Sequence, residues 1–281
     1  MSTSVERVVN TTLYRLGEPA CRRELVARVR GELRETGCSV LPDFISPDVR
    51  DTLRRECAAV APQAHYDVET VNVYNLDVGA ELPEGHPGRV TFERGNAFVA
   101  RDRIPVDAVI QRLYSSRLFQ GFVADCFGLP QVFELADPLS ALCLNVVRPG
   151  MEHPWHFDIN EFTISMLTQE PETGGVFEYC PGIRSAGDEN FAEVARVLAG
   201  NGGPLVRRLE LRPGDLQLFQ GRYSLHRVSE VEGTASRHSA IFAYSERPGV
   251  IGSVARTRQL FGRVLPAHLE AENVRVDQLL D

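Results

Sequence analysis

Apolar residues recur at helical spacing in the first third of the chain. One face of residues 24–34 is built from apolar side chains, namely Leu25, Val26, Val29 and Leu33. Gly37 ends this pattern, as expected for a residue just past the C-terminus of a helix. A second helix is predicted to begin at Ser46, because its hydroxyl can cap the helix and Pro47 suits the first helical position.

The rest of the N-terminal part is less regular. Cys38–Leu41 predicts a short strand between the two helices. Residues 62–103 are rich in Gly, Pro and Asp, and we expect them to be irregular. Two more amphipathic helices are predicted near residues 106–115 and 116–127.

After Pro130 the pattern changes to short apolar runs that are bounded by turn residues. Six such runs are predicted strands: Ala141–Val147, Phe162–Leu167, Val176–Tyr179, Leu205–Leu211, Leu216–Phe219 and Ser239–Tyr244. One helix, at about Glu189–Leu198, interrupts them. Many short strands joined by turns that contain Gly and Pro predict an antiparallel sandwich or barrel.

No repeat, low-complexity tract or linker divides the chain, so we predict one domain over residues 1–281. Its predicted fold class is mainly β with flanking helices (α+β). We expect a helical part at about 1–130, a β core at about 131–250 and a polar C-terminal tail at about 251–281. The tail is a candidate lid over a binding site and carries one aromatic residue among several arginines: Arg256, Arg258, Phe261 and Arg263.

The composition narrows the classes of function. The chain has 281 residues, of which 38 are acidic and 30 basic, and its formal net charge is −8. A hydrophobic fraction of 43% and a charged fraction of 24% are typical of a globular protein with a sizeable core. The excess of acid argues against binding to nucleic acid or to an anionic membrane. With no signal-peptide pattern at the start and no apolar run of ~18 residues, we expect a cytoplasmic protein.

Two residue types carry further information. The six cysteines are scattered without a Cys-x-x-Cys pair, so we expect reduced thiols that are mostly buried. Every one of the 30 basic residues is arginine, which we attribute to a GC-rich genome. As a chemical consequence, any carboxylate that this chain binds must be bound by arginine, histidine or neutral donors.

The most informative motif is His153–Asp158, which is followed far downstream by His226. His156 and Asp158 are two positions apart, so on a strand their side chains point to the same face. The imidazole of His226, from a later strand, would complete a facial triad of two histidines and one carboxylate. Such a triad binds Fe(II) and leaves three coordination positions open.

A His-x-Asp pair alone occurs often by chance, and the chain contains another at His65–Asp67. We predict that pair to be a surface turn, because it lies in the irregular region. The triad candidate has a further companion: Arg237 comes eleven residues after His226 and begins an apolar strand. Its guanidinium can bind a carboxylate through two hydrogen bonds, which a purely structural metal site does not need.

This spacing, over roughly residues 140–250, resembles the Fe(II)/2-oxoglutarate-dependent oxygenases. The matching residues are His156, Asp158, His226 and Arg237. The resemblance implies that the triad holds iron, that 2-oxoglutarate chelates the iron, and that Arg237 clamps the far carboxylate of 2-oxoglutarate. It also implies a double-stranded β-helix core of the jelly-roll or cupin-like type, which agrees with the predicted strands.

Two segments, His153–Ile164 and Gly174–Arg184, resemble more closely the free-amino-acid radical halogenases and their hydroxylase relatives, the BesD-like group. The halogenases of that group carry a small residue where this chain has Asp158. The resemblance therefore implies a hydroxylase that uses Fe(II), 2-oxoglutarate and O₂. Its implied substrate is a free amino acid or a related small metabolite with an unactivated C–H bond, and its co-products are succinate and CO₂.

The same resemblance suggests residues that hold the substrate. Arg94 is the candidate for the substrate carboxylate, and the alternative is a surface arginine paired with Glu93 or Asp102. His153, three positions before the first metal ligand, is a candidate at the mouth of the site, and the alternative is a strand-edge histidine in water. Trp155 alternates away from the ligand face and is predicted to pack in the core.

Further substrate-binding candidates lie around the motif and after the last apolar strand: Asp137, Asn160, Glu161 and Ser245. An acid among them would bind an amine of the substrate. Each is also typical of a turn or of the surface.

Three alternatives for the function stay open. The same chemistry can act on a carrier-bound or peptide-bound substrate, although the chain has no basic patch for an acidic carrier. The outcome can be desaturation or cyclisation in place of hydroxylation. The third alternative is a non-catalytic cupin-like metal-binding or sensor protein, and Arg237 argues against it.

Overall fold

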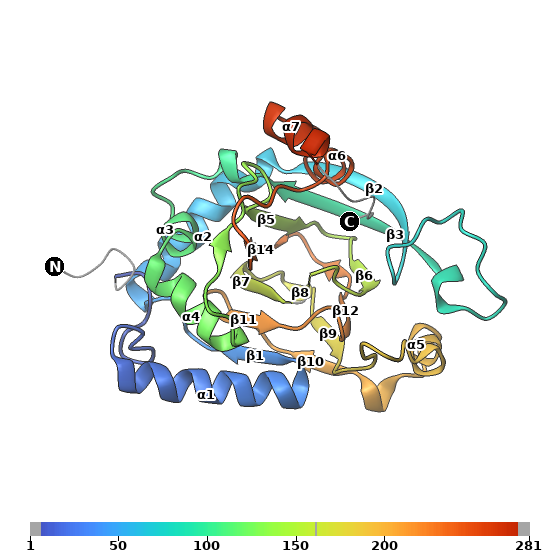
Figure 1. Cartoon of the computed structure of the whole chain (residues 1–281), viewed down its shortest axis with the longest axis horizontal. Coiled ribbons are helices and arrows are strands. Elements are labelled where there is room, and N and C mark those ends of the chain that lie inside the picture. The colour runs from blue at the N-terminus through green and yellow to red at the C-terminus, as the bar shows by residue number, and fades with distance from the viewer. Residues whose placement is uncertain (1–6, 161, 275–281) are drawn as a thin grey trace.

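The computed structural model describes residues 7–160 and 162–274 (Figure 1). Within these ranges the chain forms one seven-stranded and one four-stranded antiparallel sheet. The strands of the larger sheet, in spatial order, are β1 (Cys38–Leu41), β11 (Leu216–Phe219), β7 (Thr163–Gln169), β14 (Arg237–Phe242), β5 (Leu142–Val147), β3 (Thr91–Val99) and β2 (His65–Asn72). Those of the smaller sheet are β10 (Arg207–Leu209), β9 (Phe177–Cys180), β12 (Leu225–Val228) and β6 (His153–His156). Short strands form two more pairs: β8 (Thr173–Gly174) with β13 (Val231–Glu232), and β4 (Phe133–Glu134) with β15 (Tyr244–Ser245).

Helices flank the sheets. The α-helices are α1 (Pro19–Thr36), α2 (Pro47–Val60), α3 (Val109–Tyr114), α4 (Arg117–Phe127), α5 (Phe191–Leu198), α6 (Val254–Phe261) and α7 (Pro266–Val274). The short 3₁₀ helices are η1 (Ala61–Gln63), η2 (Pro87–Arg89), η3 (Arg101–Arg103) and η4 (Gly203–Leu205). Helix α1 ends at Gly37, whose φ of 67° lies in the left-handed region that favours glycine. In Figure 1, α6 and α7 lie at the top beside β2, and α1 runs along the bottom beside β1.

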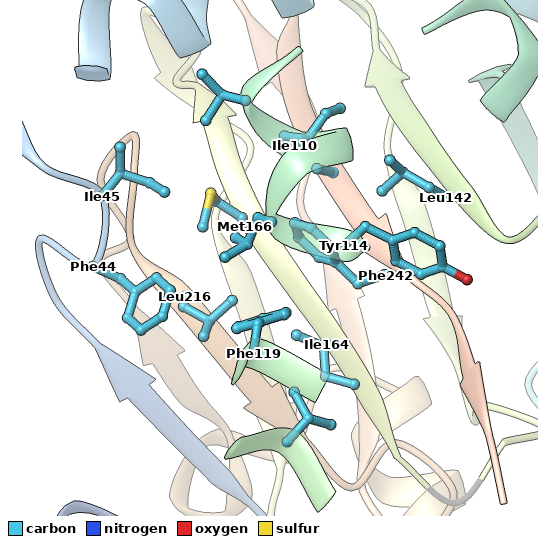
Figure 2. Packing of buried hydrophobic residues seen from close by; sticks show 14 of the residues in the cluster. Phe44, Ile45, Ile110, Tyr114, Phe119, Leu142, Ile164, Met166, Leu216 and Phe242 are labelled. Carbon is cyan, nitrogen blue, oxygen red and sulfur yellow. The ribbon is translucent and has the colours of Figure 1, made fainter. Parts of the chain in front are cut away.

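The main core lies between the larger sheet and helices α1–α4. Phe119 of α4 packs with ring centroids 5.9 Å from Phe44 and 5.8 Å from Phe242 of β14, and Figure 2 shows these side chains around Met166. Side chains alternate along β14, so Phe242 enters this core while Arg237 points to the opposite face. The larger sheet therefore has an apolar face toward the helices and a second face that is free to carry polar groups.

The predicted fold class is confirmed, and the predicted apolar runs after Pro130 form strands. One run is shorter than expected, because Gly203–Leu205 forms the 3₁₀ helix η4 and only Arg207–Leu209 joins the sheet as β10. The predicted helices near 106–115 and 116–127 correspond to α3 and α4.

The expectation for residues 62–103 is wrong. This segment contributes β2 and β3 to the larger sheet, and His65–Asp67, expected to be a surface turn, begins β2. Strand β2 is the edge of the sheet, and most of its side chains are exposed or half-buried. An edge strand that buries few apolar side chains has no alternating apolar pattern that the sequence could reveal.

The six cysteines are all free thiols, and five of them are buried. Burial raises the pKa of the Cys38, Cys57 and Cys143 thiols to about 12, which keeps them protonated and unreactive. Among the residues described, no helix combines the length and the apolar character that crossing a membrane requires.

Replacing Phe119 by alanine should lower the free energy of unfolding by about 3–5 kcal/mol, because the change removes a fully buried ring from the main core. Urea denaturation followed by circular dichroism measures this loss. Val106→Ala, at a residue that is 86% exposed, is the control and should change the free energy by less than about 0.5 kcal/mol. Equal unfolding midpoints for the two variants would contradict the packing described here.

Candidate metal centre

Strand pairing in the smaller sheet brings two histidines together. His156, the last residue of β6, lies opposite His226 of β12 in the antiparallel register, and their ring centroids are 4.1 Å apart. Asp158 completes the group: its Oδ1 lies 3.7 Å from His156 Nε2 and 3.5 Å from His226 Nε2. One ligand atom from each of the three residues lies within 4.8 Å of the other two, so one metal ion can bind all three.

Asp158 reaches this position by a route that differs from the prediction. Strand β6 ends at His156, so the aspartate is in the following loop and not on the same strand face. Hydrogen bonds hold this loop, because the Phe157 amide donates to the Val73 carbonyl at 2.9 Å and the Asp158 amide donates to the Gly221 carbonyl at 3.1 Å. The Thr163 hydroxyl donates to Asp158 Oδ2 at 2.8 Å, which leaves Oδ1 facing the histidines.

Backbone carbonyls fix which nitrogen of each imidazole faces the centre. His156 Nδ1 lies 2.8 Å from the Pro154 carbonyl, and His226 Nδ1 lies 2.9 Å from the Ser224 carbonyl. A carbonyl accepts but does not donate, so each Nδ1 carries a proton, and Nε2 is the nitrogen that faces Asp158. This arrangement of the second nitrogen is the usual one for histidines that bind metals.

The charge states suit a cation. Burial lowers the pKa of His156 well below its ordinary value, and the charges of His226 and His153 add to this effect against the opposing carboxylate of Asp158. Burial alone would raise the pKa of Asp158, but the adjacent His226 and His156 and the Thr163 hydroxyl bring it below its ordinary value. The site therefore offers a neutral imidazole at His156 and a carboxylate at neutral pH, which are the donor types of the Fe(II) facial triad.

Arg237 is the first residue of β14 and is only 5% exposed. Its Nη1 donates to the Ser239 hydroxyl at 2.7 Å. Burial lowers its pKa to about 10, and within residues 7–160 and 162–274 no carboxylate forms an ion pair with it. Sequence reasoning missed Ser239, although its place two positions after Arg237 on a strand puts both side chains on the same face.

Arg94 is buried and not on the surface. It lies opposite Glu69 in the pairing of β3 with β2, and its Nη2 donates to Glu69 Oε2 at 2.8 Å. Its Nη1 donates to Asn75 Oδ1 at 3.4 Å. The alternative prediction, a surface arginine paired with Glu93 or Asp102, is therefore wrong.

His153 lies beside the first metal ligand. Its ring stacks on that of His156, with centroids 4.2 Å apart and an angle of 25° between the planes. Burial lowers its pKa well below the ordinary value, and the positive charges of Arg94, His226, Arg256 and Arg237 act in the same direction. His153 is half-buried on β6, an edge strand of the smaller sheet, so its predicted strand-edge position is seen, and its ring packs on the ring of a metal ligand.

Asp137, a predicted substrate residue, has its acceptor positions occupied. The backbone amides of Leu139, Ser140 and Gly252 donate to its carboxylate at 2.7, 2.8 and 3.0 Å, and His268 Nε2 of α7 lies 3.3 Å from Oδ1. These contacts tie the turn before β5 to the C-terminal helices, so the structure gives Asp137 an anchoring role in place of a substrate-binding one.

None of the other predicted residues belongs to the three-ligand group found among the described residues. Asn160 is exposed in the loop after Asp158, and Glu161 lies outside the described residues. Strand β14 begins at Arg237, and Ser245 lies beyond its other end, in β15. The Ser245 hydroxyl accepts a hydrogen bond from the Arg247 amide at 3.1 Å. Trp155 is buried in an apolar cluster with Phe157, so its predicted role in packing is confirmed.

Comparison with known proteins agrees with this geometry. A family model described as halogenase D matches residues 86–256, which is more than half of the chain and includes the three ligands and Arg237. No curated protein matches the sequence.

Three solved structures share the fold. An oxidoreductase of the 2OG-Fe(II) oxygenase family from Burkholderia pseudomallei is 17% identical with a TM-score of 0.50, and the match covers 80% of this chain and 92% of that one. A prolyl hydroxylase from Trichoplax adhaerens, in complex with a peptide of hypoxia inducible factor, is 15% identical with a TM-score of 0.52 and coverage of 80% and 90%. EctD from S. alaskensis, with 2-oxoglutarate and 5-hydroxyectoine, is 17% identical with a TM-score of 0.50 and coverage of 78% and 75%. The family match and this shared fold confirm the superfamily predicted from the sequence.

Gly221 provides a test of the metal centre that leaves the three ligands unchanged. A Cβ added at Gly221 would overlap the Asp158 carboxylate and push it away from the histidines. Gly221→Ala should therefore weaken Fe(II) binding by about 10–100-fold, measured by anaerobic titration. Gly31→Ala is the control, because a Cβ there meets no atom within 4 Å, and it should leave the affinity unchanged. Equal affinities in the two variants would count against Asp158 as a ligand.

Proposed function

The chain belongs to the halogenase D family within the Fe(II)/2-oxoglutarate oxygenase superfamily, and we propose that it is a hydroxylase of a free amino acid or a related small metabolite. In this proposal His156, Asp158 and His226 hold Fe(II), and Arg237 with Ser239 binds the far carboxylate of 2-oxoglutarate. When bound, iron and 2-oxoglutarate would supply the oxidising power for an unactivated C–H bond, with O₂ as oxidant and succinate and CO₂ as co-products.

The observation that carries the proposal is that Arg237 is buried and forms no ion pair with a carboxylate of the described residues. A buried guanidinium without a carboxylate is costly unless a ligand supplies the missing negative charge. Burial lowers the pKa of His153, and the charge of Arg237 adds to this effect; the His153 ring stacks on that of the metal ligand His156. A ligand that neutralises Arg237 would therefore lie near the metal. A dicarboxylate that chelates the metal at one end and reaches Arg237 at the other meets both requirements. A non-catalytic metal-binding protein has no use for this arginine.

Asp158 supports hydroxylation over halogenation. The Thr163 hydroxyl and the Gly221 carbonyl hold the aspartate in place, so its carboxylate fills the third ligand position. A halide would need that position to be free. The family description names a halogenase, and this chain differs from a halogenase by retaining the carboxylate.

Aromatic rings protect the centre from water. Phe219 lies edge-on to the His226 ring with centroids 4.8 Å apart, and Phe177 lies 5.6 Å from the same ring. An apolar surround of this kind holds the imidazole in its orientation and limits access of solvent to the metal. On the other side of the centre, Arg94 and His153 supply the donors that we assign to the substrate carboxylate.

The function is tested with a panel of free amino acids incubated with Fe(II), 2-oxoglutarate and O₂. At least one of them should increase succinate formation and gain one oxygen by mass spectrometry, while a loss of two hydrogens would identify desaturation. Asp158→Ala and His226→Ala should reduce succinate to the level of metal-free protein, because each removes one of three ligands. Unchanged turnover in both variants would refute the triad.

Arg237→Gln tests the cosubstrate site separately. It should raise the KM for 2-oxoglutarate at least about tenfold, because one member of a buried charge pair is lost. The control is Arg247→Gln at an exposed arginine, which should leave the KM unchanged. A KM that is the same in both variants would mean that 2-oxoglutarate binds elsewhere.

A further inference from the structure

Helix α6 packs on the face of the larger sheet that carries Arg237 and Ser239, because its Phe261 lies in a cluster with Ile241 of the same face of β14. The helix packs against β2 and β3 (Figure 1). Phe261, at its C-terminal end, is buried in a cluster with Leu139 and Cys143. Arg256, in the first turn, is half-buried, while Arg258 on another face of the same helix is exposed. The two arginines therefore have different surroundings although they are two positions apart.

The groups around Arg256 belong to the candidate centre. Burial and the like charge of Arg94 lower the pKa of Arg256 against the opposing charges of Glu69 and Asp158. This agrees with the packing of α6 on β2 and β3, the strands that carry Glu69 and Arg94. Its Nη1 donates to Gln259 Oε1 at 2.5 Å, and glutamine is neutral. Within the described part of the chain, no carboxylate forms an ion pair with Arg256.

Arg94 and Glu69 form a pair that can recognise an amino acid. The guanidinium of Arg94 is 3% exposed and its Nε has no hydrogen-bond partner among the described residues, so it can still bind a carboxylate. The carboxylate of Glu69, 2.8 Å from Arg94 Nη2, can bind an ammonium group beside it. Together they offer one positive and one negative group to the zwitterionic part of an α-amino acid.

An amino acid with an uncharged side chain would leave one positive charge near the centre without a matching negative charge. Glu69 compensates Arg94, the proposed cosubstrate compensates Arg237, and Asp158 faces the metal. Arg256 forms no ion pair with any carboxylate of the described residues, and it is partly desolvated. Positive charge in such surroundings is stabilised by a ligand that brings a negative group of its own.

The sheet face next to α6 carries apolar side chains beside the buried amide of Asn145. Ile241 and Phe98 pack against the cluster that contains Cys143 and Phe261. These side chains can contact methylene groups of a substrate, and they provide no acceptor for a side-chain ammonium group.

We propose that the substrate is an acidic α-amino acid, whose amino and carboxyl groups bind Glu69 and Arg94 and whose side-chain carboxylate binds Arg256. This inference rests on the proposed function and specifies its substrate class. Arg256 is thus a specificity-determining residue that contacts the substrate.

The test compares acidic amino acids with their uncharged counterparts. Aspartate, glutamate and 2-aminoadipate are titrated beside asparagine, glutamine and norvaline into the anaerobic protein loaded with Fe(II) and 2-oxoglutarate. Perturbation of the visible iron-to-2-oxoglutarate absorption reports binding, and succinate formed after oxygen is added reports turnover. At least one acidic amino acid should bind at least about tenfold more tightly than its amide.

Arg256→Gln should remove that preference, and Arg258→Gln on the exposed face of the same helix should retain it. Arg256→Glu, a second variant at the same position, should reverse the preference so that ornithine or lysine binds more tightly than glutamate. Circular dichroism confirms that each variant is folded. Equal binding of acids and amides by the wild-type protein, or an unchanged preference in Arg256→Gln, would overturn the inference.

Failure of the proposed function has a different signature. In that case the wild-type protein shows neither the absorption band with Fe(II) and 2-oxoglutarate nor any succinate above the metal-free background. If the band is present and succinate forms, while acidic amino acids have no advantage over their amides, only the assignment of the substrate class is wrong.

Discussion

The register between β6 and β12 is the constraint on which the centre depends. It sets His156 opposite His226, and both rings are then oriented by carbonyls of their own strands, those of Pro154 and Ser224. A shift of one residue in this pairing would put the two imidazoles on opposite faces of the sheet. The two histidine ligands therefore owe their positions to strand pairing and to hydrogen bonds with backbone carbonyls.

The larger sheet has one apolar face, which packs in the main core, and one face that carries charged and polar side chains. Phe242 of β14 packs in the main core, while Arg237 and Ser239 of the same strand lie on the other face. On β3, Val99 belongs to the core and Arg94 forms an ion pair with Glu69. Alternation along each strand thus lets one sheet stabilise the fold and hold charged groups at the same time.

What the sequence could predict depended on how local the signal is. The triad and Arg237 were predictable, because their residue types and spacing carry the chemistry within short segments. Glu69 was not, because it meets Arg94 only through the pairing of the edge strand β2, whose exposed side chains show no apolar pattern. Asp137 was predicted to bind the substrate because the sequence does not show that three backbone amides donate to its carboxylate. Arg256 was one of several arginines in the tail, and only the packing of α6 distinguishes it from Arg258.

The distribution of charge explains why net charge is a poor guide to this site. The whole chain has a formal charge of −8, which argued only against polyanionic partners. Near the centre, by contrast, positive charge is concentrated: beside burial, the charges of Arg94, Arg256 and Arg237 lower the pKa of His153. Fields of this kind act over short distances in partly desolvated surroundings and are little screened by salt. An acidic protein can therefore select anionic ligands, because a few arginines held by β3, β14 and α6 determine the potential where the ligands bind.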